Sequence, residues 1–166
     1  MNPKIRTCTN EDIGLLVGMI RKSFRDVAER FSLTPETVPS HPSNYTADRL
    51  QKDLARGVVY FLIEKDGTAV GCVARELANP EVCYVERLAV LPDQRCQGLG
   101  KALVDHVLAD ARRSGAHSVS IGIIAEQTEL KNWYRKIGFI ENETKEFTHL
   151  PFRVAFLSYD IHEGPV

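Results

Sequence analysis

The segment ERLAVLPDQRCQGLGKA, residues 86–102, decides the fold. It begins as a β-rich run that Pro92 ends, passes through a short loop, and enters a helix at two glycines, Gly98 and Gly100. The first N–H groups of a helix have no partner inside it and lie at the positive end of its dipole. A phosphate group satisfies both, and glycines let its oxygens approach the backbone without meeting a Cβ atom. The segment therefore indicates a phosphate-binding site, unless the glycines merely form a turn.

Two common phosphate-binding motifs do not fit this spacing. A Walker A loop requires glycine where the chain has Arg95, and serine or threonine where it has Ala102. The dinucleotide fingerprint requires a small residue where the chain has Leu103, and it belongs to the first turn of a doubly wound sheet. An unrelated nucleotide-binding domain is therefore the weakest of the interpretations that stay open.

Hydrophobic periodicity on both sides of this segment predicts a mixed α/β (α+β) domain. We expect strands over residues 4–8, 58–64, 69–77, 83–90, 118–124, 139–147 and 152–161. We expect helices over residues 9–31, 46–56, 98–114 and 130–137. The crossover through the third helix implies at least one parallel strand pair, whereas the hairpins imply antiparallel pairs. Strand 118–124 is apolar at nearly every position, which predicts burial on both faces.

Composition limits the classes of function. The 166 residues are enough for a single domain over residues 1–166, with 43% hydrophobic and 26% charged residues. A formal net charge of -1 gives no overall attraction to nucleic acid or to an anionic membrane, so neither is an expected partner. The four cysteines lack metal-ligand spacing, and no apolar stretch is long enough to span a membrane. We therefore expect a cytoplasmic protein with reduced thiols and no metal.

Two motifs resemble those of one protein family. Arg95-x-x-Gly98-x-Gly100, preceded by Leu88-Ala89-Val90, resembles motif A of the GNAT superfamily of acyl-CoA-dependent N-acyltransferases. Residues 133–139, Trp-Tyr-Arg-Lys-Ile-Gly-Phe, resemble its motif B, a helix that carries a tyrosine and ends in Gly-Phe. The element order also matches the family over nearly the whole chain. The resemblance implies a GNAT-like fold with a central mixed sheet of about seven strands flanked by about four helices.

The resemblance also implies acetyl-CoA as cosubstrate. In the family, amides at the start of the motif A helix hold the pyrophosphate, and the exposed backbone of a bulged strand pairs with the pantetheine arm. The expected contacts are Leu88, Ala89, Val90, Arg95, Cys96, Gln97, Gly98, Leu99, Gly100, Lys101 and Gln127. Arg95 and Lys101 would add counter-charge. Gln127 stands where many members have asparagine, and its side chain is one methylene longer.

The implied reaction is direct transfer of the acetyl group to a primary amine through a tetrahedral intermediate. A free backbone N–H, that of Val90, would stabilise the oxyanion. Tyr134, as the motif B tyrosine, is the expected general acid near the sulfur, with an effect at the low end of the range of about 10²–10⁴. The resemblance implies a base or a water-holding acid on this strand, and Glu86 is the expected base, since strict alternation gives it the same face as Tyr84, Leu88 and Val90. Tyr84 and His149 are lesser candidates for the base.

Other features leave alternatives open. A catalytically silent module that binds acyl-CoA as a sensor or regulator fits the same motifs. The resemblance implies that the long segment 32–45, which contains His41, and the turn around His149 border the acceptor, a small molecule or a protein; a solvated loop and an ordinary turn are the alternatives. The last strand, 152–161, alternates apolar and polar residues, and its edge could pair with a second copy to give a homodimer. Trp133 is expected in the core.

Overall fold

The computed structural model describes residues 3–161, and its elements follow the predicted order. The strands are β1 (Lys4–Thr7), β2 (Val59–Lys65), β3 (Thr68–Asn79), β4 (Val82–Val90), β5 (Ser118–Ile124), β6 (Ile140–Glu146) and β7 (Arg153–Asp160). The helices are α1 (Ile13–Arg30), α2 (Ala47–Ala55), α3 (Leu99–Arg113) and α4 (Thr128–Ile137), with short 3₁₀ turns at Asn10–Asp12, Pro42–Asn44 and Pro92–Gln94. The predicted mixed sheet and its helices are therefore confirmed.

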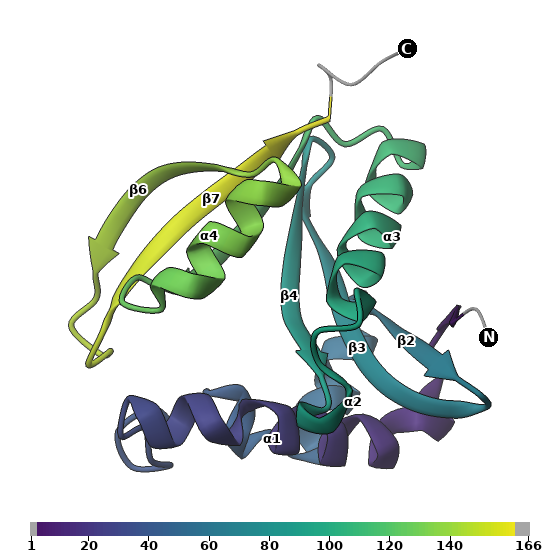
Figure 1. Ribbon diagram of the computed structural model, residues 1–166, viewed down its shortest axis with the longest axis horizontal. Coiled ribbons are helices and arrows are strands. Elements are labelled where there is room, and N and C mark those ends of the chain that lie inside the picture. Colours follow the sequence, from purple (N-terminus) through teal and green to yellow (C-terminus); the bar gives the residue numbers. More distant parts are fainter. Residues whose placement is uncertain (1–2, 162–166) are drawn as a thin grey trace.

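The strands form one sheet in the order β1-β2-β3-β4-β5-β7-β6. Within residues 3–161, β4 and β5 are the parallel pair, as the predicted crossover through α3 requires. This pairing covers Val82–Tyr84 against Ser118–Ser120 and then stops. Figure 1 shows the consequence, since β4 and the β5–β7–β6 half of the sheet diverge from there toward α1.

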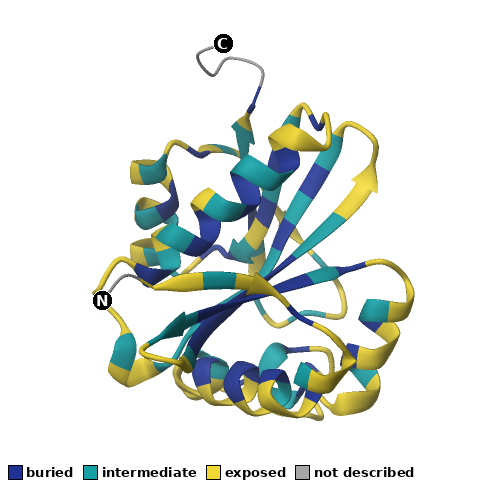
Figure 2. Cartoon of the chain, turned by 90° about the vertical axis from the view of Figure 1, so that its right-hand side faces the viewer, coloured by how far each residue is buried: buried dark blue, intermediate teal, exposed yellow. Residues whose placement is uncertain are grey.

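Helices cover both faces of the sheet and bury two large cores, and a smaller cluster of Leu33, Val38 and Ile124 lies near the end of α1. One core joins α3 to the sheet and to Tyr134 of α4, with Leu103 and Val107 fully buried. The other joins α1 and α2 to β2, β3 and β4, with Leu16, Ile20 and Leu50 fully buried. Figure 2 shows the buried positions along the sheet and on the helix faces turned toward it. Each amphipathic stripe read in the sequence thus has a partner layer.

Two predictions about strands are wrong. The first is burial of β5 on both faces, because Ser120 is half-buried and Gly122 is exposed, while Val119 and Ile121 are buried. The α1–α2 core reaches β2 to β4, and on that face of β5 the buried residue is Ile124, which packs with Leu33 and Val38 near the end of α1. The second is an open edge on the last strand, because β7 lies between β5 and β6 and pairs with both. A homodimer stays a prediction, but it cannot form by pairing of the β7 edge with a second copy.

Local sequence signals are reproduced closely. Thr9 forms the predicted capping box with Asp12: the Thr9 N–H donates to Asp12 Oδ2 at 2.8 Å, and Thr9 Oγ1 accepts from the Glu11 N–H at 3.3 Å. The box opens a 3₁₀ turn, and α1 follows it. All four cysteines are free, and within residues 3–161 we find no helix with the length and apolar character needed to cross a membrane.

Gly71 tests how tightly β3 packs on β4. A Cβ atom at Gly71 would lie 2.8 Å from the Ala89 carbonyl oxygen, which is fixed in the sheet. We expect Gly71→Ala to lower the free energy of unfolding by about 1–3 kcal/mol in urea denaturation. Gly18→Ala is the control, because nothing lies within 4 Å of that Cβ in α1, and it should stabilise by about 0.5–1 kcal/mol. Equal effects at both positions would contradict this account.

Candidate active site

The start of α3 carries unpaired backbone donors, as the sequence indicates. Gly98 is the N-cap residue, with φ +80°, a conformation that glycine adopts without strain. The first hydrogen bond within the helix runs from the Ala102 N–H to the Gly98 carbonyl at 3.1 Å. The N–H groups of Leu99, Gly100 and Lys101 therefore have no partner inside the helix. They border a cavity of about 470 Å³ between α1, α3 and α4, here called the helix-end cavity.

Gly100 has a second reason to be glycine. A Cβ atom there would lie 3.3 Å from Trp133 Cζ2 and 3.9 Å from Val90 Cγ2. Trp133 is half-buried and packs against the α3 core, as predicted, but it also lines the helix-end cavity. The indole thus lies directly against the helix start, and any larger residue at position 100 would displace it.

A β-bulge in β4 sets the direction of the side chains near the gap between β4 and β5. Cys72 pairs with Ala89 and Ala74 pairs with Glu86, so two residues of β4 lie opposite one residue of β3. Arg87, one of the two, has φ +52°, in the left-handed region that a side chain of this size rarely adopts.

The bulge makes one prediction wrong. Glu86 does not share a face with Leu88 and Val90, because the extra residue shifts the alternation between them. Leu88 and Val90 pack on the α3 core, whereas Glu86 contacts Arg87 on the α2 side of the sheet. The carboxylate and the strand segment expected to lie along the cosubstrate therefore occupy opposite faces of one strand.

The Val90 backbone turns its polar groups into the gap. The Leu91 N–H donates to the Val70 carbonyl at 2.9 Å, which makes Val90 and Gly71 a non-hydrogen-bonded pair. The N–H and C=O of Val90 therefore point away from β3, on the side where β5 has separated. Arg95 Nε donates to that carbonyl at 3.2 Å. The N–H of Val90 has the direction required of the predicted oxyanion donor.

A second cavity, of about 600 Å³, opens on the other side of the gap. We call it the carboxylate cavity. Its lining includes Glu86, Tyr84 and Tyr134 together with residues of the α1–α2 connection. It shares lining residues with the helix-end cavity, namely Phe24, Val27, Leu88, Gln127 and Leu130. The two cavities therefore adjoin where the strands part, and Gln127 lies at their junction.

The two residues expected to be catalytic both line the carboxylate cavity. Burial raises the pKa of Glu86 above its ordinary value, and the charge of Arg87 only partly offsets this. Arg87 Nη1 lies 2.6 Å from Glu86 Oε2. Tyr134 is 4% exposed, and burial raises the pKa of its hydroxyl. A carboxylate that accepts a proton more readily than usual and a neutral phenol suit a base and an acid, respectively.

Three of the residues expected near the phosphates have protein partners. Arg95 donates to Asp26 Oδ2 at 2.8 Å and to the Ser23 carbonyl at 2.7 Å, so it ties α1 to the loop before α3. The Gln97 side chain accepts from Lys65 of β2, and Gln97 does not line the helix-end cavity. Lys101 Nζ lies 2.8 Å from Asp105 on the helix surface.

Arg95 and Lys101 still border the helix-end cavity, as does Cys96, which is exposed and has φ +65°. The counter-charge assigned to Arg95 and Lys101 stays a prediction. Arg95 already has a structural function, because its contacts to Ser23, Asp26 and Val90 hold one wall of the cavity in place.

The two histidines singled out in the sequence differ in environment. His41 is buried, with 7% exposure, and lines the carboxylate cavity together with Ser40, Pro42 and Tyr45. His149 is exposed in the turn between β6 and β7, contacts the ring of Phe147, and lines neither cavity. The α1–α2 segment therefore borders the carboxylate cavity and His149 does not, while contact of His41 with an acceptor stays a prediction.

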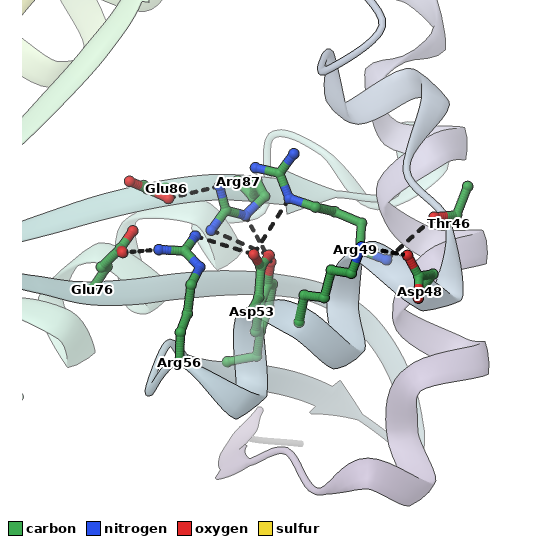
Figure 3. Close-up of polar contacts among 10 residues, drawn as sticks. Thr46, Asp48, Arg49, Asp53, Arg56, Glu76, Glu86 and Arg87 are labelled. Atoms are coloured by element: carbon green, nitrogen blue, oxygen red, sulfur yellow. Dashed lines mark hydrogen bonds and ion pairs between the residues drawn. The ribbon is translucent and has the colours of Figure 1, made fainter.

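A polar cluster beneath the carboxylate cavity was missed in the sequence. Asp53, 1% exposed, accepts a hydrogen bond from Tyr60 Oη at 2.8 Å, and Arg87 Nε donates to the same Tyr60 oxygen at 2.7 Å. Figure 3 shows the guanidinium groups of Arg49, Arg56 and Arg87 around Asp53. Arg49, Asp53 and Arg56 have i, i+4 and i, i+3 spacing along α2 and its C-cap, whereas Tyr60 of β2 and Arg87 of the β4 bulge join them only in the folded chain. The cluster holds Arg87, and therefore the neighbouring Glu86, in place.

The comparisons with known proteins are consistent with this geometry. The model of the acetyltransferase (GNAT) family matches residues 16–139. The chain belongs to the GNAT acetyltransferase family. It is 28% identical to the amino-acid acetyltransferase of Azotobacter vinelandii over 138 residues, which are 82% of this chain and 27% of that protein. An uncharacterized N-acetyltransferase of Methanocaldococcus jannaschii is 29% identical over 90 residues, 51% of this chain and 40% of that protein. The chain thus matches less than half the length of these relatives.

Solved structures with the GNAT fold superpose on nearly the whole chain. The PaiA N-acetyltransferase of Thermoplasma acidophilum, solved in complex with coenzyme A, has a TM-score of 0.80 at 18% identity, covering 96% of this chain and 100% of that one. YncA of Salmonella typhimurium, solved with its cofactor acetyl-CoA, has a TM-score of 0.72 at 14% identity, covering 100% of this chain and 98% of that one. At these identities the comparison establishes the fold.

Asp53 is expected to contribute strongly to stability. Burial opposes its charge, but the hydrogen bond from Tyr60 and the charges of Arg87 and Arg56 outweigh it, so the pKa of Asp53 is lowered. We expect Asp53→Asn to lower the free energy of unfolding at pH 7 by about 3–5 kcal/mol, because it leaves buried guanidinium charge uncompensated. The control is Asp48→Asn, an exposed residue paired only with Lys52, which should cost less than about 1 kcal/mol.

The pH dependence gives the same prediction a second test. A carboxylate with a lowered folded-state pKa stabilises the fold above its unfolded pKa, near 3.9, and loses that contribution as the pH falls through the folded value. The stability difference between the parent and Asp53→Asn should therefore be constant at neutral pH and shrink below about pH 4. A difference that grows on acidification would contradict the assignment.

Proposed function

We propose that the chain is an N-acetyltransferase that transfers the acetyl group of acetyl-CoA to a primary amine. The observation that carries the proposal is the meeting of two cavities at the point where β4 leaves β5. One ends at the unpaired N–H groups of α3, and the other contains a carboxylate and a tyrosine. The names of the relatives, acetyltransferases of amino acids or of unassigned substrates, support the same activity.

The residues present fit coenzyme A. The N–H groups of Leu99, Gly100 and Lys101 would hold the pyrophosphate, and the absence of a Cβ at Gly100 leaves the backbone accessible there. The free polar edge of Val90 and the side chain of Leu88 would lie along the pantetheine arm, with Gln127 at the junction. When bound, acetyl-CoA supplies an activated acetyl thioester. The four free cysteines fit the cytoplasmic location that we propose from the sequence.

Each step of the transfer has a residue in reach of the cavities. Glu86 would take the proton from the attacking amine, directly or through a water molecule, since an alkyl ammonium ion is not nucleophilic. The Val90 N–H would stabilise the negative charge on the carbonyl oxygen, which is worth about 10²–10³ in rate for such a donor. Tyr134 would protonate the departing thiolate. The acceptor amine would enter from the carboxylate cavity.

The Glu86–Arg87 ion pair favours a second candidate, a module that binds acyl-CoA without turnover, because a paired carboxylate is a weaker base. Incubation with acetyl-CoA and a panel of primary amines separates the two. We expect amine-dependent release of the CoA thiol, measured with a thiol reagent. Binding of acetyl-CoA by calorimetry without amine-dependent release would select the module, and binding of ATP or NAD without affinity for coenzyme A would reject both.

Gly100→Val tests the cosubstrate site. The valine side chain would meet the Trp133 ring and fill the space above the helix N–H groups. We expect the dissociation constant for coenzyme A, measured by calorimetry, to rise at least about tenfold, in line with loss of a few hydrogen bonds to charged groups. Gly14→Val, in the exposed first turn of α1 with nothing within 4 Å, is the control and should bind like the parent. Parent-like affinity in Gly100→Val would overturn the placement.

Glu86→Gln tests the base. We expect kcat/KM at neutral pH to fall by about 10²–10⁴, with unchanged affinity for coenzyme A. In the parent, kcat/KM should decrease as the pH falls through the raised pKa of Glu86, and this limb should be absent from the variant. Glu81→Gln, an exposed residue outside both cavities, is the matched control. An unchanged rate in Glu86→Gln would remove this residue from the mechanism.

A further inference from the structure

His41 is held in one tautomer by the backbone that follows it. The Ser43 N–H donates to His41 Nδ1 at 3.2 Å, and Ser43 Oγ lies 2.7 Å from the same nitrogen. A backbone N–H can only donate, so Nδ1 must be the unprotonated nitrogen of the ring. The proton of the neutral imidazole therefore sits on Nε2.

The imidazole is also held in place and uncharged. It lies edge-on to the Phe24 ring, with 5.9 Å between the ring centroids, and is 7% exposed. Burial lowers its pKa to about 4, so the ring is neutral at physiological pH. A side chain that lines the carboxylate cavity thus presents a pre-oriented N–H donor, and not a base.

The same wall of the cavity carries a loosely paired cation. Arg49 lines the cavity and stacks over Tyr45, with its Cζ 5.1 Å from the ring centroid. It reaches Asp53 through Nε at 3.4 Å, and its side chain is 41% exposed. Arg87 pairs with Glu86 at 2.6 Å, and Arg56 pairs with Glu76 and lies 3.1 Å from Asp53. Of the three arginines lining the cavity, Arg49 is the most weakly engaged.

We propose that the acceptor is an amine that also carries a carboxylate, bound by the His41 Nε2–H and the Arg49 guanidinium. This rests on the proposed function and names the substrate class of that site. Glu86 lies on β4 beside Arg87, which pairs with it, whereas His41 lies in the α1–α2 connection and Arg49 lies on α2. An amine directed to Glu86 therefore leaves the rest of the acceptor facing donors, and a carboxylate satisfies both a neutral N–H and a guanidinium.

The test compares matched acceptors in matched variants. For L-phenylalanine and phenethylamine, and for L-alanine and ethylamine, the selectivity is kcat/KM for the acid divided by kcat/KM for the amine without it. Dividing the parent's selectivity by the variant's cancels the different amine basicities of each pair. We expect this quotient to be at least about tenfold for His41→Phe and for Arg49→Gln, the loss expected for one hydrogen bond to a charged group.

Two further variants control for folding. His41→Gln places an amide donor near the position of Nε2 and should restore most of the selectivity, whereas a purely structural function of His41 would not be restored selectively for the acids. His149→Phe, in the turn outside the cavity, should leave the selectivity unchanged. Circular dichroism and coenzyme A binding establish that each variant is folded, and Arg49→Gln provides an independent arm if His41→Phe does not fold.

The outcomes separate this inference from the function on which it rests. Acetylation of both members of each pair with a quotient near one in folded variants would overturn the carboxylate proposal and leave the N-acetyltransferase intact. If coenzyme A binds but no amine in the panel causes release of the CoA thiol, both the carboxylate proposal and the N-acetyltransferase proposal would be overturned. Acetylation of the amino acids by the parent, with loss of selectivity in both His41→Phe and Arg49→Gln, would support the carboxylate proposal.

Discussion

The separation of β4 from β5 after Tyr84 is the constraint on which the site depends. A parallel pair that continued would use the outward polar groups of β4 in the sheet ladder. Here the pairing ends at Ser120, and the N–H of Val90 faces the gap instead. Unpaired backbone groups inside a protein are costly, so a gap of this kind persists only if a ligand or water completes it. The fold therefore leaves a polar backbone group at this place for a ligand or water to satisfy.

The bulge at Arg87 turns that gap into a two-sided site. By shifting the alternation, it directs Leu88 and Val90 to the α3 side and leaves Glu86 on the α2 side. A backbone conformation with φ +52° is unfavourable for arginine, and the contacts to Tyr60 and Asp53 compensate for it. One strained residue thus separates the part of the strand that would face the thioester from the carboxylate that would face the amine.

The sequence predicted the features that depend on local patterns. It did not predict the features that depend on contacts between distant segments. Apolar spacing, caps and turn residues identified every helix and strand, and the glycines at 98 and 100 marked the helix start. The resemblance implied a bulged strand, but strict alternation misplaced Glu86, because nothing in Glu-Arg-Leu signals that the residue with positive φ is Arg87. The interior position of β7 depends on strand order, which alternation along one strand does not encode. In the Asp53 cluster the spacing of Arg49, Asp53 and Arg56 is helical, but the contacts of Asp53 with Tyr60 and Arg87 join three elements, and no spacing rule identifies those.

The two walls of the candidate site come from different segments, and only one of these walls could be predicted from sequence motifs. The motifs that resemble those of the family lie at α3, β4 and α4, and in the proposed function they build the wall that binds the thioester. The opposite wall comes from the α1–α2 segment, where His41 and Tyr45 are buried by packing on α1 and α2. No motif describes that segment, which in the proposed function faces the acceptor and not the thioester. The tautomer of His41 is fixed by the backbone N–H of Ser43, a contact that exists only in the folded chain. The proposed acceptor class therefore rests on the structure and not on a sequence motif.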